Sequence, residues 1–153
     1  ELVLGTTAVR VVATPGHSPG SICLDLPADG ILLTGDTVLP AINPGLGLAM
    51  RVEGNPIRGY LASLDRIVHE FGERTGLPGH GDAIDDLPAR CEELAAHHRR
   101  RTAEVARALE AEPDATPERI APRLTWTGGG DGLSALARVS AVRQTAWHAE
   151  LVR

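Results

Sequence analysis

The chain has 153 residues, of which 42% are hydrophobic and 23% are charged, and its formal net charge at pH 7 is −5. This balance is typical of a globular protein and excludes an intrinsically disordered chain. All fifteen basic residues are arginine, which excludes a Schiff-base lysine, a lysine general base and a P-loop lysine.

The first third of the chain is predicted to form β-strands. Apolar or alternating runs at residues 9–13, 21–26 and 31–34 each end at a proline or a glycine. Such runs are expected for a meander of neighbouring strands. Residues 40–54 are rich in Gly, Pro and Asn, and we expect a long loop there.

Helices are predicted from Asn55 onward. Asn55 suits an N-cap and Pro56 suits the first helical position, and apolar residues then recur at helical spacing up to Phe71. A second, longer helix is predicted for residues 86–110, with His98 on its apolar stripe. The chain beyond Asn55 is therefore expected to be mainly helical.

Two further helices are predicted near the end of the chain. Thr116-Pro117-Glu118 begins the first, which Pro122 should shorten because proline lacks the backbone N–H that a helix needs. Glycines at 128–130 form a flexible joint before a last helix at residues 133–151. The residues expected to be buried on that helix include Leu136, Trp147 and Leu151.

The composition predicts two domains, residues 1–86 and 87–153. The first is β-rich and carries five Arg against eleven acids (5 − 11 = −6), whereas the second is helical and carries ten against nine (10 − 9 = +1). The expected fold class is α/β (α+β). Cys23 and Cys91 belong to no metal or redox spacing and are expected to be two buried thiols.

Three short motifs each place a metal-type ligand in a turn beside glycine. They are Thr14-Pro15-Gly16-His17-Ser18-Pro19-Gly20-Ser21, Leu33-Thr34-Gly35-Asp36-Thr37 and Leu77-Pro78-Gly79-His80-Gly81. Two imidazoles and one carboxylate suit zinc or a similar divalent ion, and a carboxylate can bridge two ions through its two oxygens. Each motif alone is an ordinary turn, but the order and spacing of all three are far more specific.

These segments resemble the second, third and fourth metal motifs of metallo-β-lactamase-fold hydrolases, the group that includes hydroxyacylglutathione hydrolases. The resemblance implies the C-terminal part of an αββα sandwich. The loop and helix between Asp36 and His80 also resemble one branch, in which a winged-helix-like segment follows the last ligand. Residues 87–153 fit that helical segment.

The resemblance also implies the roles of three residues. His17 would bind a first metal ion, Asp36 would bridge both ions as the catalytic residue, and His80 would bind a second ion. The cofactors implied are two divalent ions, zinc with iron or manganese as alternatives. The family's first motif, His-x-His-x-Asp-His, normally supplies two ligands to each ion and is absent from the chain. We therefore expect a chain shortened at the front, and also at the back, where the expected wing is absent.

The function implied is a metal-dependent hydrolase in which a metal-bound hydroxide attacks a small ester or thioester. Lactamases with two zinc ions generally carry another residue where this chain has Asp36, so cleavage of β-lactams is not expected. Two alternatives stay open. One is a phosphodiesterase or ribonuclease of the same fold, and the other is a non-catalytic fragment or binding module.

The expected partners follow from the same observations. An acidic first part gives no general footprint for nucleic acid, so the substrate is expected to be a small ester or thioester. The absence of a signal-like segment and of a membrane-length apolar run predicts a cytoplasmic protein without a membrane partner. The N-terminal half of the family's fold, which carries the first motif, would cover the inner face of the strands. Because its absence would leave that face uncovered, we expect a homodimer or association with that half.

Overall fold

The computed structural model describes residues 2–47, 54–126 and 134–153. The predicted glycine joint at 128–130 lies outside these residues, as do parts of the predicted long loop and the first residue of the predicted last helix. The chain divides into two compact units, Glu1–Ala96 and His97–Arg153. This division falls ten residues beyond the predicted domain boundary at residue 86. The two predicted domains, residues 1–86 and 87–153, stay a prediction.

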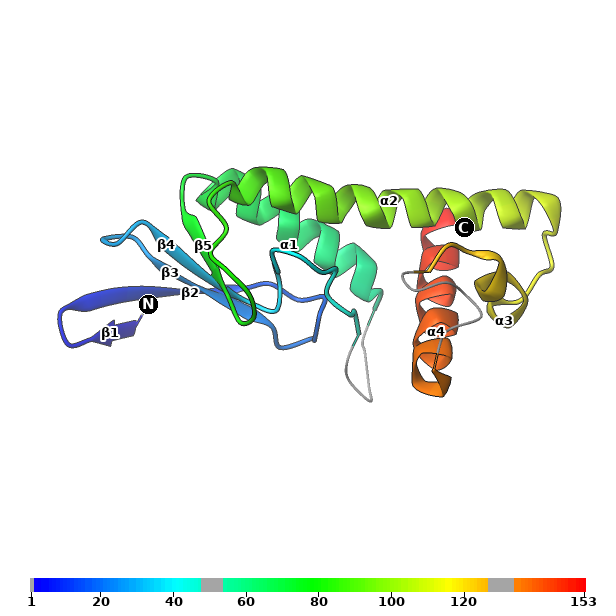
Figure 1. The fold of residues 1–153 in the computed structure, drawn as a ribbon, viewed down its shortest axis with the longest axis horizontal. Coiled ribbons are helices and arrows are strands. Elements are labelled where there is room, and N and C mark those ends of the chain that lie inside the picture. The colour runs from blue at the N-terminus through cyan, green and yellow to red at the C-terminus, as the bar shows by residue number, and fades with distance from the viewer. Residues whose placement is uncertain (1, 48–53, 127–133) are drawn as a thin grey trace. The chain divides into compact units, whose positions relative to one another are not determined.

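The first unit is built on a sheet with the strand order β1-β2-β3-β4-β5 in its described residues (Figure 1). The first four strands pair antiparallel with their neighbours, and β5 pairs parallel with β4. The strands predicted at residues 9–13, 21–26 and 31–34 are confirmed as β2, β3 and β4. The bounds are β1 (Leu2–Leu4), β2 (Thr7–Ala13), β3 (Ile22–Leu26), β4 (Ile31–Gly35) and β5 (Thr75–Pro78).

Helix α1 (Pro56–Phe71) connects β4 to β5 and begins where the sequence predicts. The Asn55 side chain accepts hydrogen bonds from the backbone N–H groups of Ile57, at 3.0 Å, and Arg58, at 3.2 Å. These bonds satisfy two of the N–H groups that the first turn of a helix leaves without partners. Helix α1 buries one apolar stripe, as predicted, through Ile57, Tyr60, Leu64, Ile67 and Phe71.

One face of the sheet forms the core of this unit together with α1 and the start of α2 (Leu87–Ala111). Val12, Cys23 and Leu32 point to this face and are at most 1% exposed. Cys23 and Cys91 are both buried, and neither forms a disulfide, which confirms the prediction of two buried thiols. Burial raises the pKa of the Cys91 thiol to about 12 and also raises that of Cys23.

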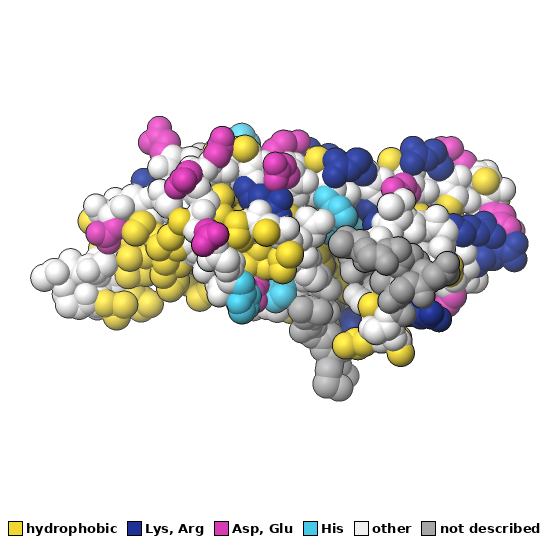
Figure 2. Space-filling view, viewed as in Figure 1, with side chains coloured by type: hydrophobic (Ala, Val, Ile, Leu, Met, Phe, Trp, Pro, Cys, Tyr) yellow, Lys and Arg dark blue, Asp and Glu magenta, His cyan; other side chains and the backbone are white. Residues whose placement is uncertain are grey.

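The other face of the sheet is apolar and uncovered in the described structure. Strand pairing aligns Val11 with Leu24, Leu24 with Leu33, and Leu33 with Leu77, so these side chains form one row. Figure 2 shows hydrophobic side chains gathered over the strands. The apolar face consists of Val11, Ala13, Ile22, Leu24, Leu26, Ile31, Leu33 and Leu77, all partly or fully exposed.

The regular secondary structure of the second unit is helical in its described residues. It contains the end of α2, a short α3 (Pro117–Ile120), a 3-10 turn (Ala121–Arg123) and α4 (Ala135–Val152). Pro122 lies in the 3-10 turn, so α3 is short, as predicted. The core of this unit consists of Val105, Leu109, Ala115, Ile120, Leu124 and Ala149.

The predicted burial of Leu136 is wrong, because this side chain is 81% exposed. Helix α4 instead buries a stripe of smaller residues, which includes Ala141, Thr145 and Ala149. At about 100° per residue, Leu136 lies about 140–220° around the helix from these three residues, so it belongs to the opposite, exposed face. Among the described residues no helix is long and apolar enough to cross a lipid bilayer.

His98 and His148 are buried next to each other in the helical unit, with exposures of 2% and 1%. Their rings are stacked with centroids 5.8 Å apart, and Thr102 Oγ1 lies 2.8 Å from His148 Nδ1. Burial lowers the pKa of His98 to about 3, and the neighbouring His97, His148 and Arg101 act in the same direction. Burial, then Arg101 and His97, lowers the pKa of His148 to about 4. Both rings are therefore neutral at pH 7.

We expect the stability of the helical unit to fall as the pH is lowered from about 6.5 to about 4. Unfolded histidine titrates near pH 6.5, whereas folded His98 and His148 resist protonation until about pH 3 and 4. Between these values the unfolded chain binds protons that the folded chain cannot, so the free energy of unfolding decreases. Urea unfolding followed by tryptophan fluorescence measures this, since Trp126 and Trp147 both belong to this unit.

A variant with His98→Leu and His148→Gln should show a flatter dependence of stability on pH. The matched control is His69→Gln, because His69 lies on the surface of α1 with its side chain 73% exposed. The control should keep the pH dependence of the original chain. A stability of the original chain that is constant between about pH 6.5 and pH 4.5 would contradict the expectation.

We also expect the isolated chain to self-associate through the apolar face. Burying one Val or Ile side chain is worth about 1.5–3 kcal/mol, so an uncovered row of them favours association. Val11 and Ile22 are 43% and 48% exposed, and changing both to Thr keeps the β-branched shape while removing apolar surface. The dissociation constant from sedimentation velocity should rise by about tenfold or more.

The matched control for this experiment is Ile42→Thr. Ile42 is 60% exposed but follows β4 in a loop, outside the apolar face. It should leave self-association unchanged. A chain that is monomeric at about 100 μM, or one whose association weakens equally in all variants, would show that the apolar face is not the contact surface.

Candidate metal centre

The topology of the sheet brings the three predicted ligands to one edge. His17 lies four residues after β2, Asp36 directly follows β4, and His80 lies two residues after β5. Since β3 is antiparallel to both β2 and β4, the strands β2 and β4 run in the same direction, and β5 is parallel to β4. The carboxyl ends of all three strands therefore meet at the same edge of the sheet.

The Asp36 carboxylate lies between the two imidazoles. His17 Nε2 is 3.7 Å from Asp36 Oδ2, and His80 Nε2 is 3.6 Å from Asp36 Oδ1. Both distances are too long for a hydrogen bond. Two N or O ligands that bind one tetrahedral zinc ion at about 2.0–2.1 Å lie about 3.3–3.4 Å apart. The distance from each imidazole to the oxygen that it faces is a few tenths of an ångström longer than this, at 3.7 and 3.6 Å. A small movement of the side chains would therefore allow each pair to bind a common ion.

The orientation of the His17 ring is fixed by the loop after β4. Its Nδ1 lies 2.7 Å from the carbonyl oxygen of Gly45. A carbonyl only accepts, so Nδ1 carries the proton and Nε2 presents its lone pair toward Asp36. A metal-binding histidine is commonly held in this way, with its other ring nitrogen donating to a carbonyl or carboxylate. The sequence did not reveal Gly45 as this partner, because any backbone carbonyl can serve.

The donor set fits a shared carboxylate with two ligands per ion, and not a complete site. Among the described residues no group of three or more His, Cys, Asp or Glu side chains could hold a metal ion. Catalytic zinc usually has three protein ligands and a water molecule. His80 is also open, with its side chain 75% exposed, whereas that of His17 is 22% exposed.

Gly79 holds the third motif against Asp36. Its backbone N–H donates to the carbonyl of Gly35 at 2.9 Å. A Cβ atom at position 79 would lie 2.8 Å from Asp36 Oδ1, which is closer than real contacts allow. A side chain at position 79 would therefore push the Asp36 carboxylate away from its place between the two imidazoles.

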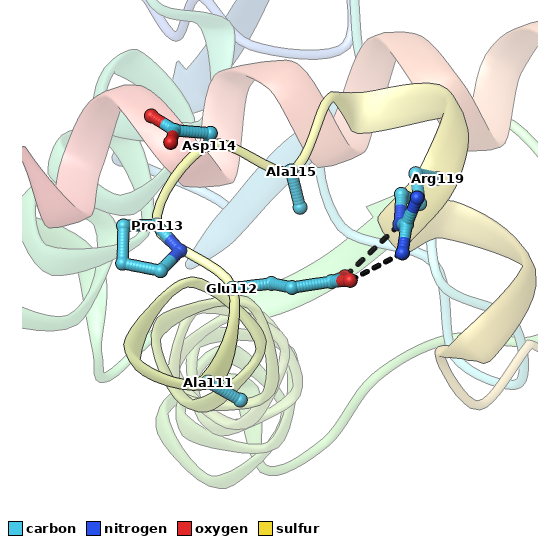
Figure 3. A pocket seen from close by; sticks show the side chains of 6 residues that line it. All are labelled: Ala111, Glu112, Pro113, Asp114, Ala115 and Arg119. Carbon is cyan, nitrogen blue, oxygen red and sulfur yellow. Dashed lines mark hydrogen bonds and ion pairs between the residues drawn. The ribbon is translucent and has the colours of Figure 1, made fainter.

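The helical unit contains a separate hollow of about 280 Å³. Figure 3 shows its lining, where Glu112 and Arg119 form an ion pair. Glu112 also accepts a hydrogen bond from Arg123 at 2.9 Å, so its charge is balanced within the protein. No metal-type cluster lines this hollow in the described residues. The lining residues are Ala111, Glu112, Pro113, Asp114, Ala115 and Arg119.

A sheet with helices on one face and a His–Asp–His set at its edge defines an α/β protein with a candidate two-ion site. The model of the metallo-β-lactamase superfamily matches residues 1–122, and the chain belongs to this superfamily. The predicted family and the predicted α/β fold class are thereby confirmed. The resemblance to hydroxyacylglutathione hydrolases stays a prediction.

Two fungal relatives are similar in sequence. The chain is 37% identical to the lactamase-like protein adaB of Aspergillus niger over 128 residues, which are 84% of this chain and 35% of the relative. It is 33% identical to the atrochrysone carboxyl ACP thioesterase of Aspergillus fumigatus over 102 residues, which are 67% of this chain and 30% of the relative. The chain thus spans about a third of these relatives.

Two solved bacterial structures match nearly the whole chain. A metallo-beta-lactamase family protein of Thermus thermophilus has a TM-score of 0.78 and 32% identity, covering 99% of this chain and 46% of its own. A beta-lactamase domain protein of Burkholderia ambifaria has a TM-score of 0.83 and 30% identity, covering 99% and 44%. The chain spans less than half of either protein.

We expect Gly79→Ala to weaken zinc binding by about tenfold, because the added methyl group must displace the Asp36 carboxylate. Competition with a chromogenic chelator measures the affinity. Gly20→Ala is the matched control, because a Cβ atom at position 20 has open space around it. Equal zinc affinities for both variants would show that the close approach of Gly79 does not control the position of Asp36.

Proposed function

We propose that this chain is part of a metal-dependent hydrolase that acts on a small ester or thioester. The observation that carries the proposal is the position of Asp36, which directs one carboxylate oxygen toward each of two imidazoles. In this proposal His17 and His80 hold one divalent ion each, and Asp36 is shared by both. Zinc is the first candidate, with iron or manganese as alternatives.

The residues of the chain would contribute in three ways. The Asp36 carboxylate would hold both ions, and its negative charge would offset part of the charge of two dications. The Gly45 carbonyl keeps the lone pair of His17 Nε2 directed into the site. When bound, divalent ions of such a site lower the pKa of water and stabilise the oxyanion that develops on a carbonyl. The partial exposure of Asp36, at 35%, leaves the edge open to a substrate.

Support for the substrate class comes from one relative. The protein that is 33% identical over 67% of this chain is named a thioesterase. Hydrolysis of a thioester and of an ester need the same attack on a carbonyl carbon, so both fit one site. Nothing in the described residues specifically favours a phosphodiester, and that activity is kept as an outcome of the test.

We further propose that more chain of the same protein completes both the site and the sheet packing. Two ligands per ion are fewer than catalytic zinc usually has. The apolar face of the sheet is uncovered in the described structure. The matched bacterial structures are more than twice as long as the part that this chain covers. A second apolar sheet surface supplied by further chain would provide cover, and a second copy of this chain is the competing occupant.

We expect Asp36→Ala in the full-length protein to lower kcat/KM by about a hundredfold or more and to remove at least one equivalent of metal. One carboxylate serves both ions, so its loss affects both. Asp36→Asn should be nearly as harmful, because the amide lacks the charge that offsets two dications. Thiol release from a thioester and metal analysis of the purified protein measure the two effects.

The control for this experiment is Asp65→Asn on the surface of α1, where the side chain is 73% exposed. It should keep full activity and full metal content. A bis-aryl phosphodiester assayed beside the thioester separates the two hydrolase classes. Near-normal turnover with full metal content in Asp36→Ala would rule out the shared-carboxylate role. Inactivity of the unsubstituted full-length protein toward both substrates would favour a binding module.

A further inference from the structure

Two buried hydroxyl groups on helix α1 donate hydrogen bonds to the two turns that carry His17 and Asp36. The Tyr60 hydroxyl donates to the carbonyl of Thr37 at 2.8 Å. The Ser63 hydroxyl lies 2.8 Å from the carbonyl oxygen of Pro15 and 2.9 Å from that of Gly59 in the same helix, so these two acceptors share its one proton. Tyr60 and Ser63 lie three positions apart, so they share one face of the helix. The two exposures are 0% and 4%, respectively.

We propose that Tyr60 and Ser63 are positioning residues that set the spacing between His17 and Asp36. The inference rests on the proposed function for its meaning, because the spacing matters only if these residues share an ion. Thr37 directly follows Asp36, and the Pro15 carbonyl precedes His17 by two residues. A rigid helix that holds both carbonyls fixes the distance between the two turns.

The two turns are also joined directly, beneath the candidate ligands. Thr14 Oγ1 lies 3.1 Å from Thr37 Oγ1, and both residues are at most 1% exposed. Thr14 Oγ1 additionally lies 3.4 Å from Cys23 Sγ, which ties the pair to β3. The hydroxyl pair and the α1 contacts therefore form one buried network that spans both motifs.

The close approach of α1 to the first motif depends on Gly16. Gly16 has φ +147°, and a Cβ atom there would lie 2.5 Å from Tyr60 Cβ. This position lies in the backbone region that glycine occupies without strain. Burial raises the pKa of the Tyr60 phenol, so its hydroxyl stays protonated and donates at any working pH. The hydrogen bond from Tyr60 to Thr37 is therefore not lost through ionisation of the phenol near neutral pH.

The first test measures local amide exchange in the metal-free chain by NMR. Three variants are compared: Tyr60→Phe, Ser63→Ala and the control Ile67→Val. Ile67 is 0% exposed on the same helix, so the control removes a buried methyl group without touching a hydrogen bond. The reporter amides are those of Thr37, which donates to Thr34, and of Gly47, which donates to Gly16.

Tyr60→Phe should speed exchange at Thr37, and Ser63→Ala should speed exchange at Gly47, each by about fivefold. The control should change both reporters no more than it changes the rest of the unit. Local exchange that matches the control in both variants would overturn the proposal. Since no metal is present, this result does not depend on whether the chain is a metalloenzyme.

The second test measures the zinc affinity of the same variants in the full-length protein by chelator competition. Each hydroxyl deletion should lower the affinity by about tenfold, whereas Ile67→Val should leave it unchanged. Faster local exchange with unchanged zinc affinity would overturn the claim that the spacing is set for metal binding. The expected exchange pattern in the chain, together with a full-length protein that binds no zinc, would count against the proposed function, and the positioning of the two turns by α1 would stand.

Discussion

The parallel pairing of β5 with β4 is the constraint on which the candidate site depends. If β5 ran in the opposite direction, the turn with His80 would lie at the far edge of the sheet, on the order of 15 Å from Asp36. Two parallel neighbours cannot be joined by a tight turn, so the chain needs a long crossover between them. Helix α1 lies in that crossover. The requirement that aligns His80 with Asp36 thus also places α1 where it can hold the turns of His17 and Asp36.

Helix α1 has two roles, since it packs against the sheet and also contacts the turns that carry the candidate ligands. Helix α1 covers the inner face of the sheet with Ile57, Leu64 and Ile67, all at most 1% exposed. The same helix carries the hydroxyl groups that reach Pro15 and Thr37. Core packing therefore restrains the ligand turns, because the helix cannot shift without opening the core. The loops that carry the candidate ligands are in this way held in place by helix α1 and the core that it packs into.

Local chemistry made part of the structure predictable from the sequence. The alternating pattern of β3 and the Asn55 cap of α1 act over a few residues, and both were found as predicted. Strands β1 and β5 were not predicted, because three and four residues give too short a pattern, and β5 contains a glycine and a proline. The burial of Leu136 failed for another reason, since apolar character alone does not determine which face of a helix meets a neighbour.

The site was predictable only in its ligands. Glycine-flanked His17, Asp36 and His80 are recognisable as residue types in turns, and the structure brings their side chains together. The groups that orient them carry no such signal. Gly45 acts through its backbone, and Tyr60 and Ser63 contact partners 23 and 48 residues away in the chain. Long-range contacts of this kind depend on the crossover geometry, which a short sequence pattern does not contain.

The buried thiols have a practical consequence for studying how the chain unfolds. Cys23 and Cys91 belong to the first unit, and both tryptophans belong to the second. Burial keeps both thiols protonated near neutral pH, so an alkylating reagent reacts with them only when the first unit opens. The rate of alkylation therefore reports the opening of the first unit, and tryptophan fluorescence reports the unfolding of the second. Both are measured in one sample without any introduced label.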